Sequence, residues 1–149
     1  MQRAKFGVVG LLLVGGVAGW QMTASAQRIV GSLPPGSESF VSAKSVEIHD
    51  ASGQVMLRGD FVTSEETADE VERTATLVAV SGNAKGKAEV ELGRVGGTVS
   101  NQEIEVEIRR LAASTSFKLV VDGRDIAQFT TSRSGNADLK YTSKMSATK

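Results

Sequence analysis

The chain has no cysteine, only two prolines and a single histidine among its 149 residues. Without cysteine it cannot form a disulfide, and the lipid-anchored form of bacterial export signal is excluded. One histidine and no cysteine supply too few nitrogen and sulfur ligands for a zinc or copper site. Asn-x-Ser/Thr is missing too, so there is no N-glycosylation acceptor. We therefore expect a domain held together by packing alone, which is more typical of a bacterial envelope or secreted protein.

The chain also lacks an excess of charge of either sign. Two of the 17 basic residues and none of the 17 acidic ones lie in residues 1–26, so the rest carries a net charge of −2. Nucleic acid requires a concentrated basic face, so we expect no nucleic-acid partner and no binding to an anionic membrane surface. The single tryptophan, Trp20, lies within those 26 residues, which disfavours sugar binding on an aromatic platform.

Residues 1–26 have the three parts of a cleavable export signal. Arg3 and Lys5 give a basic start, an uncharged stretch spans 6–20, and small residues follow at Ala24 and Ala26. As a helix, the uncharged stretch is about 22 Å long, short of a hydrocarbon core of ~30 Å. We expect a signal helix that is removed before Gln27, and a mature protein that is periplasmic or extracellular and leaves the membrane.

Alternation of apolar and polar residues dominates the remaining chain and predicts half-buried strands. It is clearest at Ile104, Val106 and Ile108, which alternate with charged residues. Asp122-Gly123 between two such runs predicts a tight hairpin. The organisation we expect is a leader or edge segment at 27–43, a β-domain at 44–143 and a mobile tail at 144–149. The fold we expect is all-β, an antiparallel, immunoglobulin-like β-sandwich of about seven or eight short strands.

The sequence also contains an internal similarity between its two halves. Shifting the chain by 49 residues places 86–92 on 135–141 and Val55 on Ile104, with a shared Gly-x-Ala-acid-aliphatic string. The match indicates either an old duplication or the coincidence of two alternating patterns.

Three groups of residues are candidates for chemistry. His49 is the only candidate for a histidine general base, although its place beside a turn favours a solvent-facing structural residue. The acidic run that includes Glu65, Glu66, Asp69 and Glu70 offers oxygen ligands for calcium, but it lacks the order of a known calcium loop. The row of Glu103, Glu105 and Glu107 fits paired carboxylates of a hydrolase. More simply, it fits a solvent-facing surface whose charges keep it hydrated and discourage pairing at a sheet edge.

The stretch 117–141, with its Val-Asp-Gly turn and Gly-x-Ala-x-Leu strand, resembles the closing hairpins of bacterial secreted β-sandwich modules. The layout of 87–110 is distantly similar to chordin-type (CHRD) domains. The histidine-containing segment of that family has no counterpart after Leu111. The resemblance implies a β-sandwich fold and carries over no active residue.

We therefore expect a non-enzymatic binding or structural module that needs no cofactor. Its partner would be another protein, a copy of itself or a cell-surface polymer. The alternatives are a calcium-stabilised adhesion or matrix module and, third, a hydrolase.

Overall fold

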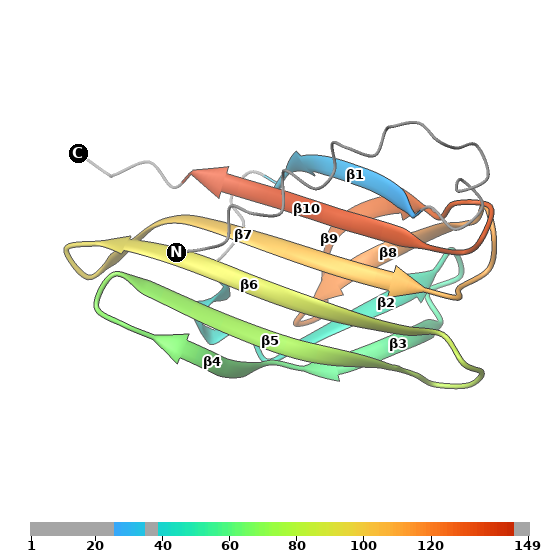
Figure 1. Ribbon diagram of the computed structural model, residues 1–149, viewed down its shortest axis with the longest axis horizontal. Helices are drawn as coiled ribbons and strands as arrows, with labels where there is room; N and C mark the ends of the chain where they lie inside the picture. The colour runs from blue at the N-terminus through green and yellow to red at the C-terminus, as the bar shows by residue number, and fades with distance from the viewer. Residues whose placement is uncertain (1–25, 35–38, 145–149) are drawn as a thin grey trace, which may run out of the picture.

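The computed structural model describes residues 26–34 and 39–144, which form an all-β domain (Figure 1). The predicted export signal before Ala26 and the tail after Lys144 lie outside the described residues. The elements in chain order are β1 (Gln27–Ser32), the 3-10 turn η2 (Phe40–Ser42), β2 (Ser45–Asp50), β3 (Val55–Asp60), β4 (Val62–Glu66), β5 (Glu70–Ala79), β6 (Lys85–Val95), β7 (Thr98–Arg109), β8 (Ser116–Val121), β9 (Arg124–Thr130) and β10 (Ala137–Lys144).

All ten strands belong to one sheet, in the order β1-β10-β7-β6-β5-β3-β2-β8-β9, with β4 also paired to β5. The sheet is mixed, because β1 runs parallel to β10 while the other pairs are antiparallel. It curls until a first layer (β1, β10, β7, β6, β5 and β4) lies over a second layer (β3, β2, β8 and β9), giving a nearly barrel-like shape (Figure 1).

The prediction of an all-β fold is confirmed, but the immunoglobulin-like sandwich of seven or eight short strands is not. Pairing is continuous from β1 to β9, so the layers are two parts of one curled sheet. β6 and β7 are also long, with 11 and 12 residues. Alternation defines which face of a strand is buried but not how the strands are joined, which is why the sequence did not predict the single sheet.

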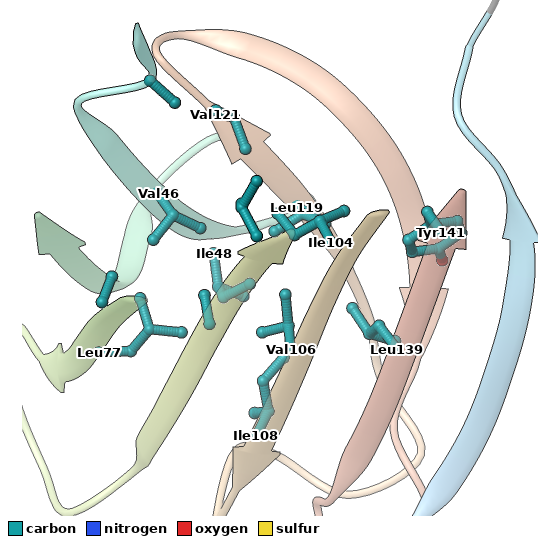
Figure 2. Packing of buried hydrophobic residues seen from close by; sticks show 14 of the residues in the cluster. Val46, Ile48, Leu77, Ile104, Val106, Ile108, Leu119, Val121, Leu139 and Tyr141 are labelled. Atoms are coloured by element: carbon teal, nitrogen blue, oxygen red, sulfur yellow. The ribbon is translucent and has the colours of Figure 1, made fainter. Parts of the chain in front are cut away.

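The core fills the space between the two layers, as alternation predicts. Ile104, Val106 and Ile108 of β7 point inward and are buried, and Ile48 and Leu119 of the second layer face them (Figure 2). Four aromatic side chains of the strands and their connections are buried as well: Phe61, Phe117, Phe129 and Tyr141. Burial of these apolar surfaces is the main contribution that stabilises a domain without disulfides.

The sheet turns its corner at strand β5. One half of β5 pairs with β4, and its other half pairs with β3 through Leu57 and Arg58 only. Gly59 lies at this corner, where a Cβ atom would come within 2.3 Å of the carbonyl oxygen of Thr76. Glycine is therefore required for β3 to approach β5 closely enough to join the two layers.

The segment 27–43, predicted as a leader or edge segment, contributes the edge strand β1 and three core side chains. Leu33, Phe40 and Ala43 are all buried, and the backbone N–H of Phe40 donates to the buried side chain of Gln102 at 2.9 Å. Gly31 lies against the ring of Tyr141, with 3.0 Å between its ideal Cβ position and the ring. Gly31 and Tyr141 are register partners, so this close approach lies within the pairing of β1 with β10.

The hairpin predicted at Asp122-Gly123 is confirmed, with φ of 50° and 81° at the two residues. The structure adds a function for the carboxylate that the sequence did not indicate. Oδ1 of Asp122 accepts hydrogen bonds from the backbone N–H groups of Lys44 and Ser45, at 2.9 and 2.8 Å. The turn between β8 and β9 is thereby attached to the start of β2.

Replacing Asp122 with alanine should remove both hydrogen bonds and place a less tolerant residue at positive φ. We expect Asp122→Ala to lower the free energy of unfolding by about 1–2 kcal/mol in urea denaturation. Asp122→Asn is the matched control, because asparagine keeps one acceptor oxygen and tolerates positive φ, and it should lose less than half as much. Equal losses in the two variants would contradict this account of the turn.

The internal similarity at a shift of 49 residues is not matched by a repeat in the strand pairing. It matches β5 with β9 and β6 with β10, yet β5 and β6 are paired neighbours while β9 pairs with β8 and β10 with β7 and β1. Among the described residues, the pairing pattern of the first half is therefore not repeated in the second.

Candidate functional site

The outer surface of the first layer is densely charged, because charged residues alternate with the core residues along its strands. We call its central part, on β5, β6, β7 and β10, the charged face, and between Glu72 and Lys85 along the strands it presents the outward side chains Glu72, Lys85, Lys87, Glu89, Glu91, Glu103, Glu105, Glu107, Arg109, Asp138 and Lys140. Seven acids and four bases give it a net charge of −3.

Strand register places several of its glutamates directly opposite one another. Glu91 of β6 lies between Glu72 of β5 and Glu103 of β7, and Glu89 lies opposite Glu105 one row further along. Directly opposed residues on neighbouring antiparallel strands have Cβ atoms about 5 Å apart, and like charges in such pairs destabilise the sheet. The face therefore carries three directly opposed glutamate pairs on its central strands.

One lysine partly offsets this repulsion. Lys140 Nζ lies 3.5 Å from Glu103 Oε1 and 3.4 Å from Glu105 Oε1. Burial raises the pKa of Glu103 above its ordinary value, and nearby Glu105 raises it further, whereas Lys140 lowers it. Glu103 is thus the carboxylate on this face whose charge is hardest to maintain.

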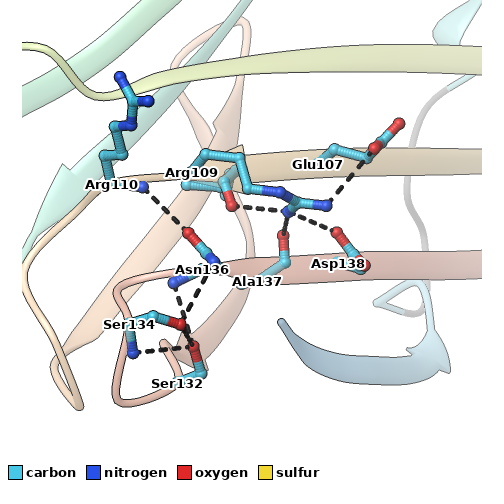
Figure 3. Close-up of polar contacts among 9 residues, drawn as sticks. Glu107, Arg109, Arg110, Ser132, Ser134, Asn136, Ala137 and Asp138 are labelled. Carbon is cyan, nitrogen blue, oxygen red and sulfur yellow. Dashed lines mark hydrogen bonds and ion pairs between the residues drawn. The ribbon is translucent and has the colours of Figure 1, made fainter. Parts of the chain in front are cut away.

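The opposite end of the charged face is basic. Lys85 of β6 lies opposite Arg109 of β7. The Arg109 guanidinium donates to Asp138 at 2.7 Å and to the carbonyl of Ile108 at 2.8 Å, and it lies 3.6 Å from Glu107 (Figure 3). Charge is therefore segregated along the strands, with acids at one end and bases at the other.

The single histidine lies on the outer surface of the second layer, not in a solvent-facing turn. His49 belongs to β2 and is mostly buried, with 20% of its side chain exposed. Its Nε2 atom lies 2.9 Å from Glu47 Oε1, and Arg58 donates to the other oxygen of Glu47 at 2.9 Å. Hydrogen bonds from His49 and then Arg58 lower the pKa of Glu47.

The two pKa shifts predict opposite pH trends. A lowered pKa at Glu47 stabilises the fold at pH above about 4.5, and this contribution is lost as the pH falls through the folded-state value. A raised pKa at Glu103 acts in reverse, because its ionisation in the folded state opposes folding as the pH rises.

We therefore expect Glu47→Gln and Glu103→Gln to differ in sign when unfolding is measured from pH 3 to pH 7. Wild type should gain stability relative to Glu47→Gln with rising pH, and lose stability relative to Glu103→Gln. Parallel pH profiles for the two variants would contradict the assigned environments.

The calcium candidates lie along the β4–β5 hairpin. Glu65 and Glu66 are in β4, Asp69 is in the turn and Glu70 begins β5. Glu66 pairs with Arg94 at 3.3 Å. Within the described residues, no group of three or more histidine, cysteine, aspartate or glutamate side chains is placed to hold a metal ion.

The two alternative candidates for hydrolysis lie on different surfaces of the domain. His49 lies on the outer surface of the second layer, whereas Glu103, Glu105 and Glu107 lie on that of the first. The predicted wet outer face of β7 is confirmed. The sequence did not reveal the facing glutamates of β5 and β6, because the pairing register that aligns them is a tertiary property.

The comparisons with known proteins add no function. The chain gives no match to a family model, to a curated protein or to a solved structure. No match supports the similarity to chordin-type domains. No helix in the described part of the chain is long and apolar enough to span a membrane.

Proposed function

We propose that the chain is an exported, non-enzymatic β-module that binds another protein through its charged face. The observation that supports this most strongly is the set of three directly opposed glutamate pairs on central strands. Such pairs oppose folding of the free domain. Local arrangements that conflict with stability are expected where a surface serves binding.

The mixed charge of the face favours a protein over a uniformly charged polymer. A cationic polymer would match the glutamate-rich end but would be repelled by Lys85 and Lys87 at the other end. A folded partner can present both signs in a fixed pattern, and complementary patterns provide orientation and specificity. The export part of the proposal is based on the basic, apolar and small-residue segments of 1–26.

Site-specific photo-crosslinking in the exported fraction tests this proposal. A photoreactive residue at Thr76, which is exposed and shares a row with Lys87, should give a defined protein adduct. The matched control is Gln128, which is exposed on β9 in the second layer and should give none. Adducts of equal yield from both positions, or none from either, would overturn the proposal.

A further inference from the structure

We infer that the partner bound by the charged face is a second copy of this chain, packed face to face about a twofold axis perpendicular to the strands. This inference rests on the proposed function and specifies its partner. The charges of the face lie in rows that cross β5, β6, β7 and β10 in the strand register.

The rows form a charge gradient along the strands. The first row contains Glu72, Glu91 and Glu103, and the second contains Glu89, Glu105 and Lys140. The third row contains Lys87, Glu107 and Asp138, and the fourth contains Lys85 and Arg109. Their formal charges are −3, −1, −1 and +2 in that order.

A twofold axis that lies in the interface along the row direction reverses the order of the rows. Each strand then lies over the same strand of the second copy, running in the opposite direction. The first row faces the fourth row of the partner copy, and the second faces the third. Such an isologous contact closes on itself as a dimer, and sheets that pack face to face are about 10 Å apart.

The outer rows become complementary in this arrangement. Glu91 faces Lys85 of the second copy along β6, and Glu103 faces Arg109 of the second copy along β7. By symmetry each pairing occurs twice. Glu91, which lies between two other glutamates in its own sheet, thus faces a lysine of the second copy.

The inner rows are complementary at two of three charged positions. Glu89 faces Lys87 of the second copy, and Lys140 faces Asp138 of the second copy. Only the pairing of Glu105 with Glu107 brings like charges together.

The size of the face suits a stable contact. The four strands that carry the charged face, β5, β6, β7 and β10, are spaced about 4.8 Å apart and span roughly 19 by 33 Å. That footprint of roughly 630 Å² per partner would bury about 1,260 Å² in total, which is at the lower end of the range for standard protein interfaces. Because its attraction is mostly electrostatic, association should be sensitive to salt.

Charge exchange at the outer rows tests the dimer without unfolding the monomer. Glu91→Lys and Lys85→Glu should each weaken dimerisation at least about tenfold, since each puts like charges across the interface twice. Each change also removes a like-charge pair within the monomer, so loss of dimer cannot be ascribed to misfolding. The double variant restores opposite charges across the interface and should dimerise at least as well as wild type.

Sedimentation velocity over a range of protein concentrations at about 0.15 M and about 1 M salt is the measurement. The expected result is a wild-type dimer that weakens about tenfold or more in high salt, loss of dimer in both single variants, and its recovery in the double variant. A wild-type protein that stays monomeric at about 1 mM, or a double variant no better than the singles, overturns the second copy as partner. A monomeric protein that still gives a specific adduct from Thr76 overturns only this inference and leaves the proposed function standing.

Discussion

Leu77→Ala is expected to lower the free energy of unfolding by about 2–5 kcal/mol. Leu77 is buried on β5 at the point where the two layers join, and its methyl groups lie 3.2 and 3.0 Å from where Cβ atoms added at Gly59 and Gly86 would be. Glycines on both neighbouring strands make room for this side chain, so removing it leaves a cavity that rigid strands cannot close.

Val78→Ala is the matched control, because Val78 is the next residue on the same strand and is 62% exposed. It should change stability by no more than about 0.5 kcal/mol. Chemical denaturation monitored by circular dichroism gives both values. Similar losses in the two variants would show that the inward and outward faces of β5 are assigned incorrectly.

Gly59→Ala is the second substitution with a large expected effect. Glycine to alanine within a strand ordinarily stabilises a protein slightly, because it restricts the unfolded chain. At Gly59 the new methyl group would meet the carbonyl oxygen of Thr76, which is backbone and cannot rotate away. We therefore expect a loss of about 3 kcal/mol, since β3 must move away from β5 and the layers separate at their corner.

Asp60→Ala is the control for that position, since Asp60 is the next residue, is exposed and still lies within β3. Its thermal midpoint should stay close to that of wild type. A gain of stability in Gly59→Ala would mean that β3 and β5 do not approach so closely, and the corner as described would be wrong.

The local features of the fold were accessible from sequence because they depend on neighbouring residues. Alternation at Ile104, Val106 and Ile108 identified the buried face of β7, and Asp122-Gly123 identified the turn between β8 and β9 from the need for positive φ. Successive side chains of a strand point to opposite faces of the sheet, so the buried face can be identified from the sequence whichever strand lies beside it.

The features that sequence did not reveal depend on long-range pairing. β7 lies between β6 and β10, which precede and follow it in the chain, and β1 joins β10 from more than 100 residues away. The curl of one continuous sheet depends on Gly59, which in the sequence appeared only as one small residue in an alternating run. Pairing of this kind is determined by the whole core.

The same limit applies to the candidate site. The glutamates of β7 were recognised as a polar outer row, but their opposition to Glu89 and Glu91 depends on the register with β6. His49 is predicted at the end of a strand beside the turn that starts at Ala51, and the structure places it there, but its contact with Glu47 was not predicted and arises because residues two apart on a strand share a face.

Carboxylate footprinting by mass spectrometry tests the central claim, that the charged face is covered by a protein partner. The native exported fraction and the isolated, dilute protein are labelled with a carbodiimide and an amine, and modification is compared at Glu89, Glu91 and Asp125. The account predicts that Glu89 and Glu91 are protected in the native fraction, while Asp125, exposed on the second layer, is labelled equally in both samples. Equal labelling of Glu89 and Glu91 in the two samples would contradict it.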